Sequence, residues 1–148
     1  MINEVKKLKF NFVLQIVGDG FEMENLQNLI NNLNLKNKVK LLGFCQNIPQ
    51  ILADSHLQVI SSRKEGLGIV LIEGIFYSNI LISSCVGDSE EILGPDFIYK
   101  NLSDKINQIF YNYNSFHKNF KIVKEKSIKN FTFENYINNI KRYYREIL

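Results

Sequence analysis

The sequence predicts a single α/β domain built on a doubly wound parallel sheet with helices on both faces. Short apolar, β-branched runs each stop at a glycine or polar turn, helical segments alternate with them, and 148 residues is the usual size of one domain. Such alternation favours parallel strands joined by right-handed crossovers. The composition, 45% hydrophobic and 22% charged, is that of a globular chain and excludes disordered and fibrous classes.

The first part of the chain reads as two strand and helix units. Residues 10–17, FNFVLQIV, form an apolar run that stops at a glycine turn, as a buried parallel strand does. Residues 21–35 carry apolar side chains at helical spacing with acids early, where the helix dipole favours them. Residues 39–43 repeat the strand and its turn, and 48–54 form a short helix with Pro49 in its first turn.

The alternation continues through the second part. Residues 57–61 are expected to form the third strand, 61–68 a polar, glycine-bearing loop, and 69–77 a helix that is apolar nearly all round and must therefore be buried. A fourth strand at 80–83, a turn and short helix at 86–93 and an edge-like fifth strand at 97–99 follow. Helices are predicted at 102–110 and 133–148, whereas the pattern assigns no structure to 111–129.

Charge and cysteine usage bear on partners and location. The formal charge of +3 comes from scattered basic residues, which predicts solvated lysines and no nucleic-acid binding, with contact to an anionic membrane surface as the lesser alternative. Cys45 and Cys85 form no CxxC pair and no metal-ligand spacing. No apolar run approaches the roughly 18 to 20 residues that span a bilayer, and no signal sequence is visible. We expect a cytoplasmic protein, at most peripheral at the inner face of the membrane.

The turns beyond the carboxyl ends of the strands are the candidate site, because ligands of open parallel sheets bind there. If the helix after the third strand begins near Gly68, its free amide groups and positive dipole end could hold a diphosphate. Glu65 could then accept hydrogen bonds from sugar hydroxyls, and Glu73, a carboxylate on an apolar helix, from a ribose diol. Taken alone, two glutamates at this spacing arise often by chance, and Glu73 could equally cap a neighbouring loop or lie at the surface.

Four motifs, in order, resemble the C-terminal, donor-binding domain of glycosyltransferase family 4, also called group 1, enzymes of the GT-B fold. They are LQIVGDG at 14–20, VKLLGF at 39–44, SSRKEGLGIVLIE at 61–73 and VGDSEEIL at 86–93. The third carries the family's two glutamates separated by seven residues and is the most specific. The resemblance spans roughly residues 8–93.

This resemblance implies a retaining hexosyltransferase that takes a UDP- or GDP-linked sugar as co-substrate, without a metal ion or other cofactor. The acceptor it implies is a glycan or a lipid-linked glycan, as in the assembly of lipopolysaccharide or capsule. Glu65 is implied to be catalytic, near the donor sugar hydroxyls, and Glu73 to bind the ribose. The other implied donor-binding residues are Gly18, Gly20, Phe44, Cys45, Arg63, Gly66, Leu67, Gly68, Ile69 and Val70. Glu91 matches the acid of the family's final turn, in a role either functional or structural.

Departures from the family pattern keep other readings open. Phe76, Ser78, Ile80 and Asp88 stand where the family usually has small residues, glycine or proline. Family members also have an earlier strand with an Arg and a Lys that clamp the phosphates, preceded by an acceptor domain. We therefore expect residues 1–148 to be a single nucleotide-sugar-binding domain that lacks both parts.

Two alternatives remain. The first is a truncated, non-catalytic or partner-dependent nucleotide-sugar-binding module that pairs with a separately encoded N-terminal half. The second is an unrelated doubly wound interaction domain such as a receiver. Receivers need an acidic cluster at the strand ends to bind metal, and the first turn offers only Asp19.

Overall fold

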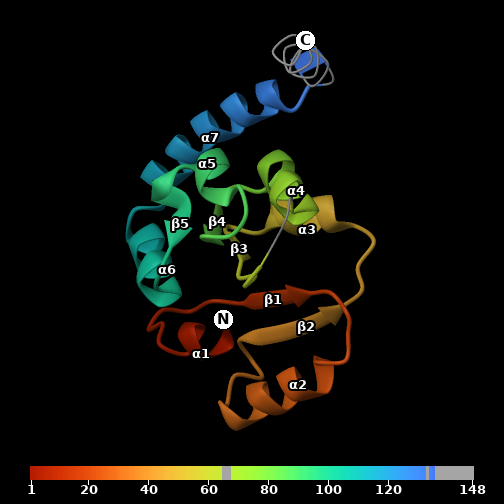
Figure 1. The fold of residues 1–148 in the computed structure, drawn as a ribbon. Coiled ribbons are helices and arrows are strands. Elements are labelled where there is room, and N and C mark those ends of the chain that lie inside the picture. Colours follow the sequence, from red (N-terminus) through yellow and green to blue (C-terminus); the bar gives the residue numbers. More distant parts are fainter. Residues whose placement is uncertain (65–67, 133, 136–148) are drawn as a thin grey trace. The chain divides into compact units, whose positions relative to one another are not determined.

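The computed structural model describes residues 1–64, 68–132 and 134–135 (Figure 1). The chain divides into two compact units, Met1–Ile48 with Asn101–Phe110, and Pro49–Lys100 with Tyr111–Leu148. All three strand pairs are parallel and helices connect them, which confirms the predicted α/β class. The strands pair as one two-stranded and one three-stranded sheet, each within its own unit.

The first unit is built on a strand, helix and strand. β1 (Leu14–Val17) pairs with β2 (Val39–Gly43), and α2 (Met23–Asn32) connects them and lies along one face of the pair (Figure 1). β1 is shorter than predicted because its partner strand begins at Val39, opposite Leu14. The aromatic residues before Leu14 pack through their side chains instead. Phe10 stacks on Phe110 at a centroid distance of 3.8 Å.

Aliphatic side chains from α2 and both strands fill the core of this unit. The buried members are Ile2, Ile30, Leu35 and Val39, and partly buried leucines and isoleucines surround them. Ile2 belongs to α1 (Ile2–Val5), a single helical turn that the sequence did not predict. α6 (Leu102–Tyr111) also joins this unit, where Ser103 Oγ donates to the Glu4 carboxylate at 3.2 Å.

The second unit holds the three-stranded sheet. Its order is β3 (Gln58–Ile60), β4 (Leu81–Ser84) and β5 (Ile98–Tyr99). α4 (Ile69–Tyr77) connects β3 to β4, while α5 (Ser89–Leu93) and the 3-10 helix η1 (Pro95–Phe97) connect β4 to β5. α3 (Ile48–Asp54) precedes β3. The central strand β4 is the core of this unit, since its first three residues are fully buried.

Residues 111–129, which the sequence left unassigned, are mostly helical. α7 (Tyr113–Asn130) packs against α4 and α5 and buries Phe120, whose ring meets that of Phe97 edge-on at 5.4 Å. The predicted helix at 133–148 lies largely outside the described residues. No helix in the described part of the chain is long and apolar enough to cross a membrane.

The prediction that α4 must be buried is wrong for half of its surface. Leu71 and Ile75 are buried, but Ile69 is 73% exposed and Val70 48% exposed at the first turn. α4 has only nine residues and packs on β3, β4 and α7 along one side. The opposite side and the first turn are therefore open to solvent, although the sequence there is apolar.

Candidate functional site

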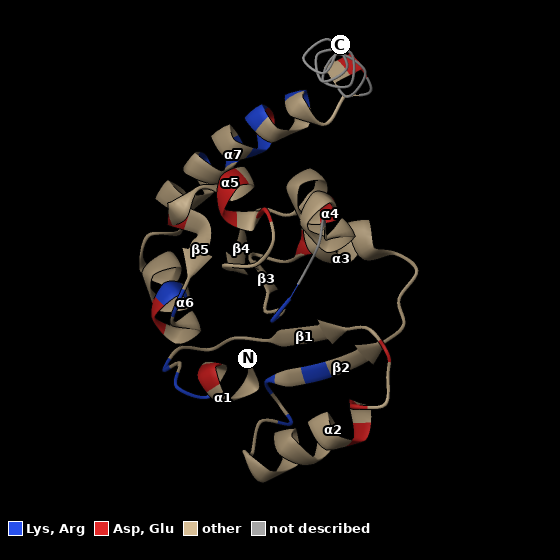
Figure 2. Cartoon of the chain, in the orientation of Figure 1, with Lys and Arg blue, Asp and Glu red and all other residues tan. Residues whose placement is uncertain are grey.

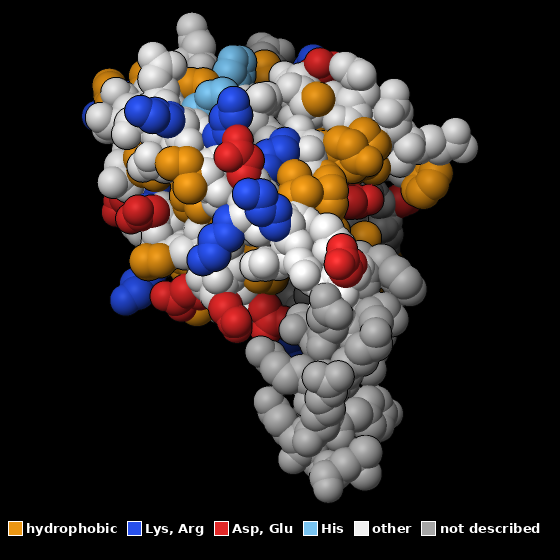
Figure 3. All heavy atoms as spheres, turned by 90° about the horizontal axis from the view of Figure 1, so that it is seen from above, with side chains coloured by type: hydrophobic (Ala, Val, Ile, Leu, Met, Phe, Trp, Pro, Cys, Tyr) orange, Lys and Arg blue, Asp and Glu red, His pale blue; other side chains and the backbone are white. Residues whose placement is uncertain are grey.

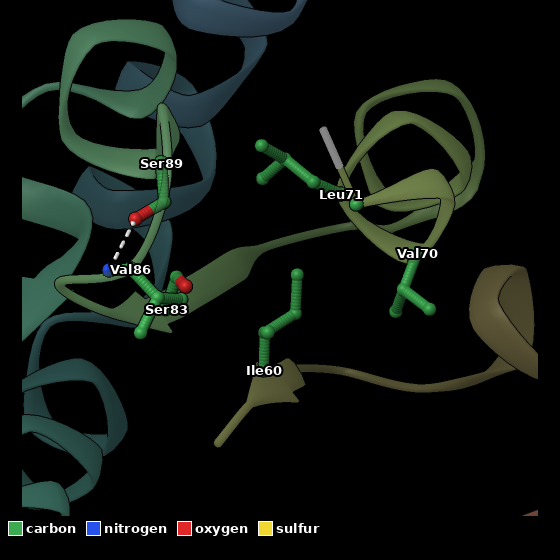
Figure 4. A pocket seen from close by; sticks show the side chains of 7 residues that line it. Ile60, Val70, Leu71, Ser83, Val86 and Ser89 are labelled. Atoms are coloured by element: carbon green, nitrogen blue, oxygen red, sulfur yellow. Dashed lines mark hydrogen bonds between the residues drawn. The ribbon is translucent and has the colours of Figure 1, made fainter. Parts of the chain in front are cut away.

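A pocket lies at the carboxyl ends of β3 and β4, between the first turns of α4 and α5 (Figure 4). This is the edge of a parallel sheet at which ligands bind, as the sequence predicted. Apolar side chains and two serines share its walls. The lining residues are Ile60, Gly68, Val70, Leu71, Ser83, Val86 and Ser89.

The first turn of α4 borders this pocket through Gly68, Val70 and Leu71. Gly68 is the N-cap residue, and no described side chain caps the helix. The amide groups of Leu71 and Ile72 donate to the Gly68 carbonyl, at 2.9 and 3.4 Å. The amides of Ile69 and Val70 precede the first intrahelical bond, where a helix has free donors and a positive dipole end. The start of a helix with free amide groups is the kind of site that binds an anionic group such as a phosphate.

Glu73 lies one helical turn beyond Ile69 and is half-buried. Its carboxylate makes no hydrogen bond and no ion pair with any described residue. Glu73 does not line the pocket itself. Within the described part of the chain this half-buried carboxylate has no partner, and a carboxylate of this kind can accept hydrogen bonds from a ligand.

A glutamine and a glycine seat α4 on the sheet. Gln58, at the start of β3, donates through Nε2 to the Val70 carbonyl at 3.3 Å and accepts through Oε1 from the Ser78 hydroxyl. Its amide lies against Gly74, where a Cβ atom would overlap Gln58 Oε1 and Leu81 Cδ2. The glycine at position 74 thus lets the helix approach the strands closely, and Gln58 fixes both ends of the helix.

Four hydroxyl groups in or beside the walls of the pocket were not singled out from the sequence. Ser84 Oγ donates to the Ser62 carbonyl at 2.8 Å, and Tyr99 Oη donates to the Ile60 carbonyl at 3.0 Å. Ser89 Oγ donates to the Ser84 carbonyl at 3.1 Å and accepts from the Val86 amide (Figure 4).

The fourth hydroxyl, that of Ser83, also donates to the Ser84 carbonyl, at 2.8 Å. Serines and a tyrosine at strand ends give no periodic signal. The only sequence signal for these groups was the run of small polar residues after an apolar strand.

The other predicted site residues are divided among several places. Gly18, Gly20, Phe44 and Cys45 belong to the first unit, at the carboxyl ends of β1 and β2, and Phe44 is 77% exposed. Arg63 is exposed in the second unit. The predicted catalytic Glu65 and its neighbours Gly66 and Leu67 lie outside the described residues. Glu91 is exposed on α5, which carries acidic residues (Figure 2).

Charge near the pocket is partly set by those acids. Glu90 Oε2 lies 3.2 Å from the Sγ atom of Cys85, and this hydrogen bond together with the negative charge raises the pKa of the Cys85 thiol. The described residues contain no group of three or more His, Cys, Asp or Glu that could hold a metal ion. Basic, acidic and hydrophobic side chains are interspersed on the face shown in Figure 3.

Comparisons with known proteins show what the chain is similar to. The family described as "Glycosyl transferases group 1" matches residues 1–126. An uncharacterized glycosyltransferase of Methanocaldococcus jannaschii is 42% identical over 102 residues, which cover 68% of this chain and 24% of that protein. The lipopolysaccharide core biosynthesis glycosyltransferase LpsD of Rhizobium meliloti is 38% identical over 106 residues, 72% of this chain and 29% of that protein.

A solved structure extends the comparison to the fold. Anabaena HepE in complex with UDP-glucose matches 98% of this chain and 44% of its own, with a TM-score of 0.85 and 21% sequence identity. The present chain spans about a quarter of the length of the curated relatives it matches.

Proposed function

Because the chain belongs to the group 1 glycosyltransferases, we propose that it is the donor-binding domain of a retaining hexosyltransferase. Family membership confirms the resemblance indicated by the four sequence motifs. Under this proposal the pocket of the second unit receives the diphosphate and sugar of a nucleoside-diphosphate sugar, and Glu73 accepts hydrogen bonds from the ribose. Contact between the nucleobase and the backbone around Phe44 and Cys45, in the first unit, stays a prediction.

The first turn of α4 carries this proposal. Breaking the bond between the anomeric carbon and the diphosphate oxygen leaves a new negative charge on the diphosphate. Amide groups aimed at that charge stabilise it without reorganising during the reaction. The amides of Ile69 and Val70, in a helix turn that no described side chain caps, have the chemistry required. The acceptor hydroxyl then forms the new bond to the anomeric carbon, and its proton passes to an oxygen of the departing diphosphate.

The relatives support an acceptor class. LpsD is named for lipopolysaccharide core biosynthesis, and HepE was crystallised with UDP-glucose. We propose that the whole enzyme transfers a hexose to a glycan or to a lipid-linked glycan, with a UDP- or GDP-linked sugar as the donor. A lipid-linked acceptor would place this reaction at the inner face of the membrane.

Calorimetric titration of the chain with UDP, GDP and their sugars tests the donor site. We expect saturable binding of one nucleotide. Glu73→Gln, which keeps the size of the side chain and removes its charge, should weaken binding about tenfold, the effect of losing a charge-assisted hydrogen bond of roughly 1.5 kcal/mol. Glu125→Gln, at an exposed glutamate on α7 in the same unit, is the matched control and should bind as the wild type does.

The outcomes separate the readings. Weakening in both variants would show a general charge effect and no specific role of Glu73. Failure of the wild-type chain to bind any nucleotide would contradict the donor site in this chain and favour the non-catalytic or partner-dependent module.

A further inference from the structure

Building on the proposed function, we propose that Tyr99 and Ser84 are positioning residues of the donor site. Their hydroxyl groups hold the backbone where the chain leaves β3, and so set the wall of the pocket that begins at Ile60. Neither residue lines the pocket. Each acts through the main chain of a residue at or just beyond the end of β3.

Tyr99 reaches across the end of the central strand. It lies on β5, in register with Ser84 of β4, while its hydroxyl donates to the Ile60 carbonyl on β3, two strands away. Neighbouring strands lie about 4.8 Å apart, so the main chain of β5 cannot bond to β3 and only a long side chain bridges that distance. Burial raises the pKa of the Tyr99 hydroxyl. Like any tyrosine, it is a protonated donor at neutral pH.

Ser84 connects the two walls of the pocket. Its hydroxyl donates to the Ser62 carbonyl at 2.8 Å, on the β3 side. Its own carbonyl accepts from Ser89 Oγ at 3.1 Å, and Ser89 is the first residue of α5, on the opposite side. A change at Ser84 therefore shifts the residues after β3 relative to the first turn of α5.

The position of these hydrogen bonds explains why they order only the chain that leaves β3. The ladder between β3 and β4 ends at the pair formed by Ile60 and Ser83. Beyond that pair, the hydroxyl groups of Ser84 and Tyr99 donate to main-chain carbonyls, as the amide groups of a neighbouring strand do within the sheet. Removing one hydroxyl should loosen the chain that leaves β3 while the paired strands remain.

Tyr99→Phe and Ser84→Ala remove one hydroxyl each, and the chain provides a matched control. Tyr113 Oη donates to the His56 carbonyl at 3.5 Å, just before β3 begins, so Tyr113→Phe removes a longer and more exposed tyrosine-to-carbonyl bond at the opposite end of the strand. Burial raises the pKa of Tyr113 as it does that of Tyr99. Ser84→Thr keeps the hydroxyl and serves as the rescue variant.

Two measurements on the 148-residue chain test the proposal. Hydrogen–deuterium exchange reports on the amides of residues 61–64, and calorimetry reports the affinity for whichever nucleotide the wild type binds. Tyr99→Phe and Ser84→Ala should speed exchange and weaken affinity about fivefold, the effect of one neutral hydrogen bond. Tyr113→Phe and Ser84→Thr should match the wild type in both, even where thermal stability falls.

Unchanged exchange and affinity in Tyr99→Phe and Ser84→Ala would overturn the inference. Equal losses of affinity in Tyr99→Phe and Tyr113→Phe would overturn it too, because they would show general loosening. A wild-type chain that binds no nucleotide would instead contradict the proposed function. The exchange rates would still decide whether the two hydroxyls order residues 61–64.

Discussion

Replacing Gly74 by alanine tests how tightly α4 is seated on the sheet. A Cβ atom at this position would overlap Gln58 Oε1 and lie 2.7 Å from Leu81 Cδ2, whereas ordinary contacts of a Cβ atom begin at 3.4 Å. Leu81 is fully buried, so its side chain moves only if its neighbours in the core move with it. The Gln58 amide is held by its bonds to Val70 and Ser78 and can move only by breaking them.

Opposing effects set how much Gly74→Ala changes the free energy of unfolding. Alanine favours a helix over glycine by about 1 kcal/mol. Overpacking a buried contact costs about 1 to 3 kcal/mol, and each hydrogen bond lost by Gln58 costs roughly 1 kcal/mol more. We expect Gly74→Ala to lower the free energy of unfolding by about 1 to 3 kcal/mol. For a chain of this size that is a fall in Tm of roughly 3 to 9 °C.

Urea titration of four proteins gives the assay: wild type, Gly74→Ala, Gln58→Ala and the double variant. Gln58→Ala should cost about 2 kcal/mol by itself through its two hydrogen bonds. Because it also removes one of the two overlaps, Gly74→Ala should cost less in that background than in the wild type. A Gly74→Ala chain as stable as the wild type, or strictly additive costs, would refute the reasoning about close approach.

Two further predictions concern pH and reactivity. Glu90→Gln should lower the pKa of the Cys85 thiol and speed its alkylation by iodoacetamide near neutral pH, because the thiolate is the nucleophile. Mass spectrometry measures the alkylation rate, with Cys45 as the internal reference. An unchanged rate would count against the contact between Glu90 and Cys85. The raised pKa of Tyr99 means that its contribution to stability is complete below its ordinary pKa of about 10 and is lost as pH rises through the folded-state value. Above pH ~10, the free energy of unfolding of the wild type should therefore fall more steeply than that of Tyr99→Phe, and parallel pH curves would contradict this.

Elements with strong periodicity were predicted well from the sequence. The bounds expected for α3 and α4 are those observed, and α2, β2 and β4 differ by a few residues at most. Glycines and polar turns mark these elements clearly. α1 was missed because it is a single turn, too short to produce a pattern.

α7 shows why the remainder was harder to predict. Its buried face includes Phe120 and Ser127, and lysines and asparagines interrupt the apolar spacing along the rest of the helix. No described side chain caps its start. The helix depends on packing against α4 and α5, which are distant in sequence, and a local pattern cannot express that dependence.

The candidate site was also predicted only in part from the sequence. Helix-start chemistry predicted Gly68, the family resemblance implied Val70, and both line the pocket. Ser84, Ser89 and Tyr99 were missed because their importance lies in the carbonyls to which they donate. Those partners are set by the strand order β3, β4 and β5, which only the three-dimensional structure gives.

The two tyrosines that donate hydrogen bonds near the ends of β3 also bear on the order in which the protein folds. Their bonds join residues 39 and 57 positions apart, Tyr99 to Ile60 and Tyr113 to His56. Contacts between such distant residues form late, since the intervening chain must first be ordered. During synthesis, β3 and the wall of the pocket that follows it therefore remain incompletely held until β5 and the start of α7 have left the ribosome.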